Sequence, residues 1–257
     1  MRVLVISDVH ANLTALDEVL ADASSAEWLG RTGFDAIWSL GDIVGYGPWP
    51  NECIARLQQF DGHLRVAGNH DWAALGRLDV EEFNREARKM VLWTQRQLNP
   101  ASLAYLRSLP DRPLLYDDFT ITHASPREPV WEYINNGTVA RENAGSFDTP
   151  YCLVGHTHVP RIYRLTPGPE PAQVACTVHG PVIDRDISLA GPHSLIINPG
   201  SVGQPRDNDP RAAYALLDTE QALWRYRRVR YDVEITQAAM RKAGLPERLI
   251  ARLAYGW

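Results

Sequence analysis

Cysteine is scarce in this sequence. The chain has 257 residues but only three cysteines, Cys53, Cys152 and Cys176, and they lie far apart. A disulfide framework needs more cysteines, and a zinc ribbon needs paired C-x-x-C spacing, so both classes are excluded. We interpret the three cysteines as small buried hydrophobic residues without a redox role.

Long hydrophobic runs are absent too. No stretch approaches the about 20 apolar residues that cross a bilayer, and the first run, Val3–Ile6, is too short for the core of a signal peptide. The chain has 26 basic and 31 acidic residues, a net charge of −5. This charge gives no general attraction to nucleic acid or anionic membrane, so affinity for phosphate must come from a local site. The sequence predicts a cytoplasmic protein.

The first half of the chain alternates strand and helix patterns. Strand patterns at 3–6, 36–40 and 64–67 are separated by helical patterns that follow Asn12 and surround Cys53. This order predicts parallel βαβ units. A longer helical pattern covers 69–109 and ends at Pro110.

After residue 112 the pattern changes to short β-like runs. They cover 113–116, 118–122, 151–154, 160–165, 172–178, 194–197, 212–217 and 222–230. The polar segment 125–150 is predicted to be an excursion over the surface, and amphipathic stretches at 233–243 and 246–254 follow. With no linker or repeat, we expect one domain over 1–257, with a motif-bearing core at about 3–218 and a helical extension at about 233–254.

Five polar motifs follow apolar runs. They are Ser7–His10, Gly41–Asp42, Gly68–Asp71, Thr122–His123 and Gly155–His158, and they hold five of the eight histidines. Asp-x-His or Gly-Asp alone fits an ordinary turn, but His-x-His after a strand favours a metal site. Because the carboxyl ends of parallel strands face one crevice, the motifs can converge there. Alternate residues of a strand point to opposite sides, so the backbone must bend between the two histidines of the last motif.

These motifs together resemble the calcineurin-like metallophosphoesterase superfamily over about residues 3–218. Gly41–Pro48 and Asn198–Arg206 are similar to a compact prokaryotic phosphodiesterase-like branch. The resemblance implies an α/β fold, a sandwich of two mixed β-sheets flanked by helices. It also implies two divalent metal ions, manganese first, with iron, zinc or nickel as alternatives for nitrogen and oxygen ligands.

The resemblance implies a role for each motif residue. His70 would contact the phosphate and protonate the leaving oxygen, and a hydroxide bridging the metal ions would attack the phosphorus. Asp71 has two open interpretations, a helix cap and a part in the chemistry. The implied ligands are Asp8, His10 and His158 for the first metal, Asp42 for the bridge, and Asn69, His123 and His156 for the second metal.

One departure concerns the loop after Asp42. Protein Ser/Thr phosphatases read G-D-x-x-D-R, with an Asp that orients the catalytic His and an Arg that binds phosphate, whereas this chain has Gly45 and Tyr46. Arg206 is a candidate for the phosphate contact, and Arg127 is better interpreted as an ordinary surface residue.

The expected function is hydrolysis of a small phosphate-ester substrate, namely small phosphodiesters or nucleotides. Phosphomonoesterase and dinucleoside polyphosphate hydrolase activities remain open alternatives. A metal-binding interaction scaffold is a third, but His70 beside a full set of ligands favours catalysis.

Overall fold

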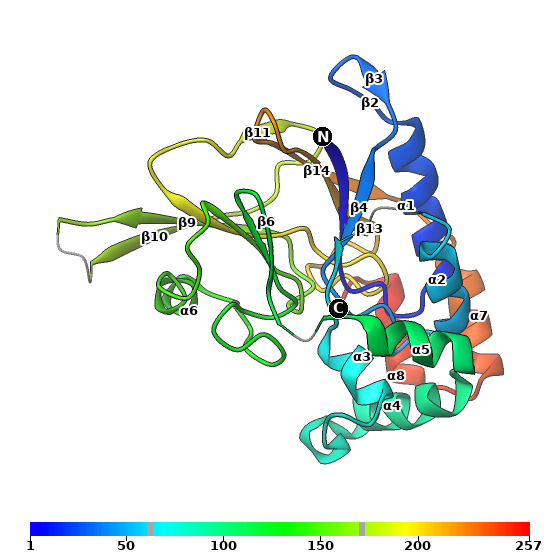
Figure 1. Cartoon of the computed structure of the whole chain (residues 1–257). Coiled ribbons are helices and arrows are strands. Elements are labelled where there is room, and N and C mark those ends of the chain that lie inside the picture. The colour runs from blue at the N-terminus through cyan, green and yellow to red at the C-terminus, as the bar shows by residue number, and fades with distance from the viewer. Residues whose placement is uncertain (61–63, 111, 170–172) are drawn as a thin grey trace.

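The computed structural model describes residues 1–60, 64–110, 112–169 and 173–257. The strands within these ranges form two six-stranded mixed sheets and a small hairpin, β2 (Glu27–Trp28) with β3 (Arg31–Thr32). Figure 1 shows the two large sheets beside each other with helices on the outer faces. The predicted α/β sandwich is therefore confirmed.

The first sheet joins the N-terminal strands to late ones. In spatial order it contains β11 (Asp186–Ser188), β14 (Leu223–Val229), β13 (Ala212–Asp218), β1 (Arg2–Ile6), β4 (Ala36–Ser39) and β5 (Leu64–Arg65). β1, β4 and β5 are parallel to one another, and β13 runs antiparallel to β1. Three of the motifs follow the parallel strands.

The second sheet has its own parallel part. In spatial order it contains β10 (Val174–His179), β9 (Arg161–Pro167), β12 (Ser194–Asn198), β8 (Tyr151–Leu153), β7 (Phe119–Ile121) and β6 (Leu114–Tyr116). β12, β8 and β7 are parallel, and the remaining pairs are antiparallel. The other two motifs follow β7 and β8.

Helices cover the outer faces of both sheets. Figure 1 shows α1, α2 and α7 along the first sheet and α6 beside the second. The C-terminal helices α7 and α8 share an apolar cluster with α4 and Tyr46. The helices are α1 (Leu13–Ser25), α2 (Pro50–Leu57), α3 (Asn69–Ala74), α4 (Arg85–Gln97), α5 (Pro100–Ser108), α6 (Gly137–Glu142), α7 (Val233–Lys242) and α8 (Glu247–Ala251).

Burial of β1 on both faces explains its continuous apolar run. Leu4 and Ile6 belong to the core between the first sheet and its helices, and Val3 and Val5 belong to the core between the two sheets. A strand covered on both sides has no place for alternating polar residues. The strand that carries the first motif is thus fixed between two cores.

Two predicted segments differ from the structure. The helical stretch 69–109 is divided into α3, a 3-10 turn, α4 and α5, because Gly76 has φ +70° and Asn84 and Asn99 cap new helices. The segment 125–150, predicted as a surface excursion, contains α6 and buries Ile134 and Phe147.

Smaller differences concern strands. The β2–β3 hairpin and β11 have no counterpart in the predicted strands, because each is only two or three residues long. Residue 172 of the predicted run 172–178 lies outside the described residues, and β10 covers 174–178 of the remainder.

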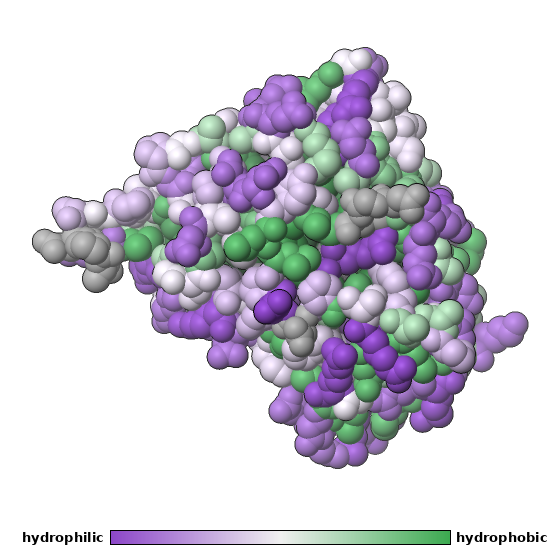
Figure 2. All heavy atoms as spheres, viewed as in Figure 1, coloured by the Kyte–Doolittle hydropathy of each residue, from purple (hydrophilic) through white to green (hydrophobic). Residues whose placement is uncertain are grey.

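The surface is mainly hydrophilic on the face in Figure 2, with a smaller hydrophobic area near the centre of the view. Within the described ranges, no helix is both long and apolar enough to span a bilayer. All three cysteines are free. Cys53 and Cys152 are buried, as predicted, but Cys176 in β10 is only partly buried, so the prediction of burial is wrong for it.

Candidate metal centre

The five motifs meet at the carboxyl ends of β1, β4 and β5 in one sheet and β7 and β8 in the other. Their chemistry-bearing side chains are all buried, with at most 5% of any residue exposed. The residues are Asp8, His10, Asp42, Asn69, His70, His123, His156 and His158. Side chains separated by up to 150 residues (8 to 158) therefore share one interior site.

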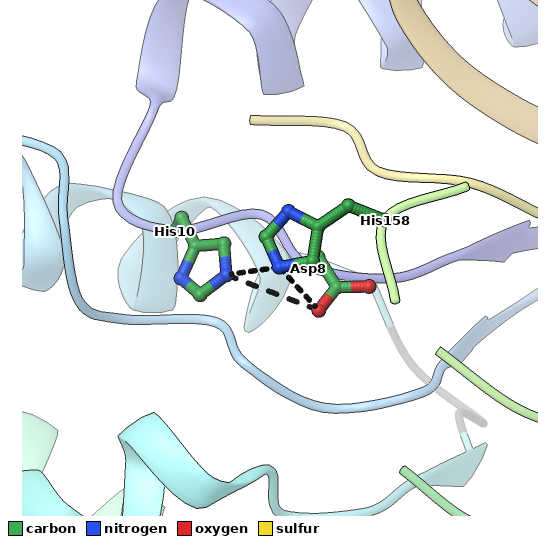
Figure 3. Close-up of side chains that lie close together, drawn as sticks. All are labelled: Asp8, His10 and His158. Carbon is green, nitrogen blue, oxygen red and sulfur yellow. Dashed lines mark hydrogen bonds and ion pairs between the residues drawn. The ribbon is translucent and has the colours of Figure 1, made fainter. Parts of the chain in front are cut away.

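Asp8, His10 and His158 form the first group, and Figure 3 shows them pointing toward one another. The Nε2 atoms of the two histidines lie 3.1 Å apart, and His158 Nε2 lies 3.3 Å from Asp8 Oδ1. Two main-chain oxygens lie beside the opposite nitrogens: Val44 O is 3.1 Å from His10 Nδ1, and Gln204 O is 2.6 Å from His158 Nδ1.

This first group fits a cation. Each Nδ1–H donates to a carbonyl, so each Nε2 carries a lone pair, and two lone pairs at 3.1 Å cannot bond each other. Asp8 Oδ1 is buried and has no hydrogen-bond partner among the described residues. A metal ion satisfies all three atoms at once, and carbonyl acceptors on the far nitrogens are usual for metal-binding histidines.

Asp42, His123 and His156 form the second group, with ligand atoms within 4.8 Å of one another. His123 Nδ1 donates to Leu40 O at 2.7 Å, and its Nε2 lies 3.2 Å from Asn69 Oδ1. His156 Nε2 donates to a main-chain oxygen at 3.3 Å, which leaves Nδ1 as the free nitrogen. The predicted amide ligand thus lies beside this group.

Asp42 lies between the two groups. Its Oδ2 is 3.6 Å from His10 Nε2 in the first group and 3.4 Å from His123 Nε2 in the second. Its Oδ1 accepts the His70 N–H at 2.8 Å. One carboxylate oxygen therefore faces a histidine of each group, as a bridging ligand requires.

The backbone is strained where it presents these side chains. Five of the seven predicted ligands have left-handed φ values, between +48° and +63°. Non-glycine residues in this region cost about 1–3 kcal/mol each and cluster at functional sites. His156 and His158 are both among the five, so the bend that the H-x-H spacing requires is present.

Glycines of two motifs make room for close contacts. A Cβ on Gly68 would lie 2.0 Å from Asp42 Oδ1, and a Cβ on Gly155 would lie 1.9 Å from Ser7 Oγ. Gly68 and Gly155 are therefore required by space and not only by turn geometry.

The model for the calcineurin-like phosphoesterase superfamily domain matches residues 1–222. The chain belongs to this superfamily. It is a metallophosphoesterase with two buried Asp/His clusters.

Individual relatives of this metallophosphoesterase cover its whole length. The uncharacterized protein MJ0912 of Methanocaldococcus jannaschii is 34% identical over 99% of this chain and 98% of its own. The crystal structure of a metallophosphoesterase from Sphaerobacter thermophilus is 48% identical, covers 100% of both chains and has a TM-score of 0.85. The hypothetical protein PH1004 of Pyrococcus horikoshii shares the fold, with a TM-score of 0.73, 20% identity and coverage of 100% of this chain and 98% of that one.

In this metallophosphoesterase His70 is oriented by packing. Its ring centroid lies 4.4 Å from that of Tyr46 and 5.3 Å from that of Phe83. Its buried Nδ1 has no hydrogen-bond partner in the described part of the chain. A Cβ on Gly45 would lie 2.7 Å from this Nδ1, so the position that phosphatases fill with Asp must be glycine here.

Burial and the neighbouring charges set the pKa values of the site. Burial raises the pKa of Asp8 to about 7. Burial also acts to raise the pKa of Asp42, but His123 and His70 outweigh it and hold the pKa below its usual range. Burial acts to lower the pKa of His123, but Asp42 raises it to about 9. A proton on His123 therefore supplies the positive charge beside Asp42 when no metal is bound.

The other histidines favour the neutral form. Burial lowers the pKa of His70 to about 4, and it holds the pKa values of His10, His156 and His158 well below their usual range. Neutral imidazoles are the form that binds metal ions.

The structure shows the contacts of three further residues that the sequence analysis discussed, Asp71, Arg127 and Arg206. Asp71 accepts the Gly68 N–H at 3.0 Å and the Val44 N–H at 3.1 Å, so it ties the start of α3 to the loop after β4. Arg127 is ion-paired with Glu132 and Glu142 at the surface. Arg206 lies over the Tyr46 ring, with its Cζ 5.8 Å from the centroid.

Some contacts of the site have no signal in the sequence. Tyr133 stacks on the His156 ring at 3.7 Å, and Trp131 supplies the carbonyl that this histidine bonds. Ser201 Oγ donates to Asp8 O at 2.9 Å, and Asn198 Nδ2 donates to Gly155 O at 2.6 Å. The sequence of 198–206 resembles that of the phosphodiesterase-like branch, but its hydrogen bonds to the loops that carry Asp8 and His156 are evident only from the fold.

Proposed function

We propose that this metallophosphoesterase hydrolyses small phosphodiesters or nucleotides with the help of two divalent cations. The observation that carries the proposal is the position of Asp42 Oδ2, 3.6 Å from a histidine of one group and 3.4 Å from a histidine of the other. A shared carboxylate oxygen is typical of paired metal ions in phosphate-ester hydrolases.

The proposed ligand sets follow the two groups. The set for the first ion is Asp8, His10, His158 and Asp42, and the set for the second is Asp42, Asn69, His123 and His156. Nitrogen and oxygen donors without thiolate suit manganese, and iron, zinc and nickel remain alternatives. When bound, such a pair lowers the pKa of water and offsets the charge of the phosphoryl group.

His70 is the proposed general acid. Its main-chain N–H is bonded to Asp42 and its ring packs on Tyr46, so the imidazole is held at the edge of the bridging carboxylate. Burial keeps the free imidazole neutral, and an anionic ester beside it favours the protonated form. The proton is then delivered to the leaving oxygen, which matters most for poor leaving groups.

The preference for diesters rests on the loop after Asp42. A monoester carries two negative charges at neutral pH and gains most from a bidentate arginine. Gly45 and Tyr46 occupy the loop positions where phosphatases have the orienting Asp and that arginine, and Arg206 lies over the Tyr46 ring. A diester, with one charge, depends less on such a clamp.

A matched pair of substrates tests the proposal. Protein stripped with chelator and reloaded with Mn²⁺ is assayed on bis-p-nitrophenyl phosphate and p-nitrophenyl phosphate, which share one leaving group. We expect a higher kcat/KM for the diester and no turnover before reloading. A clear preference for the monoester would overturn the diester assignment and leave the metal assignment standing.

A further inference from the structure

A cavity of about 800 Å³ lies next to the metal centre. It is formed by the loop after β4, the start of α4, and α8 with the residues that follow it. Its lining includes Tyr46, Arg85, Glu86, Arg248, Arg252 and Trp257, none of which is a proposed metal ligand.

Tyr46 lies between the cavity and the metal centre. Its ring centroid lies 4.4 Å from that of His70 and 4.7 Å from that of His10, and the residue also lines the cavity. Arg206 lies against this tyrosine, with Cζ 5.8 Å from the ring centroid. One aromatic ring thus separates the cavity from the proposed general acid.

The charge around the cavity is unbalanced. Three arginines and one glutamate line it, and Arg206 adds a fourth positive charge beside Tyr46. Within the described ranges, Arg85 and Arg206 have no carboxylate within 4.0 Å, whereas Arg248 Nε lies 3.8 Å from Glu86 Oε2. Arg85 is exposed and Arg206 is half-buried, and a bound anion stabilises cations that have no carboxylate partner.

Arg252 is the most enclosed of the three lining arginines. It donates from Nε to the main-chain oxygen of Trp257, and burial together with the nearby charge of Arg206 lowers its pKa to about 10. Its remaining guanidinium donors have no hydrogen-bond partner among the described residues. Trp257 also lines the cavity and is 58% exposed; one face of its indole stacks on Tyr255, and the other is available for stacking.

We infer that this cavity binds a second phosphate group of the substrate, so that the preferred substrates are nucleotides with a phosphate beyond the one hydrolysed. The inference rests on the proposed function, because it places the unreacting part of the same substrate behind Tyr46. Arginine guanidinium groups bind phosphate through paired N–H donors, and an indole stacks on a nucleobase.

Two esters that differ by one phosphate test the inference. The p-nitrophenyl ester of thymidine 5′-phosphate and its 3′-phosphorylated form share the reacting diester and the leaving group. We expect the 3′-phosphorylated ester to have a kcat/KM higher by about tenfold or more, since charged hydrogen bonds are made only with it. Arg252→Gln should remove most of this preference, and Arg248→Gln, a change at an exposed side chain, should reduce it.

Arg107→Gln is the matched control. This exposed arginine on α5 does not line the cavity, and the substitution removes the same charge. The control should keep the full preference. Equal kcat/KM values for the two esters in an active wild-type protein would overturn the inference, as would a preference that Arg252→Gln and Arg248→Gln both leave unchanged.

A binding measurement separates this inference from the proposed function. Calorimetry compares adenosine 3′,5′-bisphosphate with adenosine 5′-monophosphate on the Mn²⁺-loaded protein, without turnover. Tighter binding of the bisphosphate by about tenfold, lost in Arg252→Gln, supports the cavity even if no diester is hydrolysed. Normal hydrolysis of diesters with equal affinity for the two nucleotides contradicts the cavity and leaves the proposed function intact.

Discussion

Gly155→Ala is the most specific perturbation that this metal centre offers. The new Cβ would lie 1.9 Å from Ser7 Oγ and 3.0 Å from Asp8 Oδ2. Cβ contacts below 3.0 Å are essentially never seen, so either Ser7 Oγ or one of the two main-chain segments must move by at least 1.1 Å, the difference between 3.0 and 1.9 Å. Ser7 follows β1 and Gly155 follows β8, so the strands restrict both segments. The displacement therefore affects Ser7, the residue next to Asp8.

The expected magnitude follows from that displacement. A misplacement of about 1 Å at a catalytic group costs about 100-fold in rate, equivalent to about 2.7 kcal/mol. We expect kcat/KM of Gly155→Ala to fall by about that factor, together with its content of the first metal ion. Overpacking should also lower the free energy of unfolding by about 1–3 kcal/mol.

The assay combines diester hydrolysis, metal analysis and thermal unfolding. Gly145→Ala is the matched control, because a Cβ there would meet nothing within 4 Å. The double variant Ser7→Ala/Gly155→Ala removes the closest atom and should recover part of the activity. Activity within about threefold of wild type in Gly155→Ala, with metal content unchanged, would refute the steric reasoning, because about 1 Å of displacement is expected to cost far more.

Three further predictions concern the ligands and the acid. Asp42→Asn should lose both metal ions and activity together, measured by elemental analysis and hydrolysis; retention of one ion with full affinity would argue against a bridge. His70→Ala should keep its metal content but lose about 100-fold or more in kcat, and less for good leaving groups; an equal loss across leaving groups would exclude general acid catalysis. Because the pKa of His123 without metal is about 9 and that of Asp8 is about 7, Mn²⁺ affinity should rise between pH 7 and 9 by about tenfold per unit for one displaced proton; a pH-independent affinity from calorimetry in this range would contradict the proton on His123.

The sequence predicts that the candidate metal-binding side chains converge, because each of them follows a strand. β1 is apolar throughout because both of its faces are covered, and Asp8 is the second residue after its end. The parallel direction of β1, β4 and β5 then brings the following loops to one edge. Proximity of residues as distant as Asp8 and His158 is thus predictable from local patterns and one topological rule.

Other features depend on packing that local patterns do not report. The segment 125–150 reads as polar, yet it buries Ile134 and Phe147 and brings Tyr133 onto His156. The cavity near Arg252 forms only because α8 and the start of α4 meet the loop that carries Tyr46. Such contacts join distant segments without a motif on either one, so they need the three-dimensional structure.

The central claim is that one carboxylate, Asp42, links two divalent cations. Electron paramagnetic resonance of the chelator-stripped protein, titrated with Mn²⁺, tests it most directly. We predict that a second equivalent of Mn²⁺ converts the spectrum of isolated ions into that of an exchange-coupled pair, and that Asp42→Asn abolishes the conversion. A spectrum of isolated ions at every loading, in protein that hydrolyses diesters at its full rate, would contradict the account.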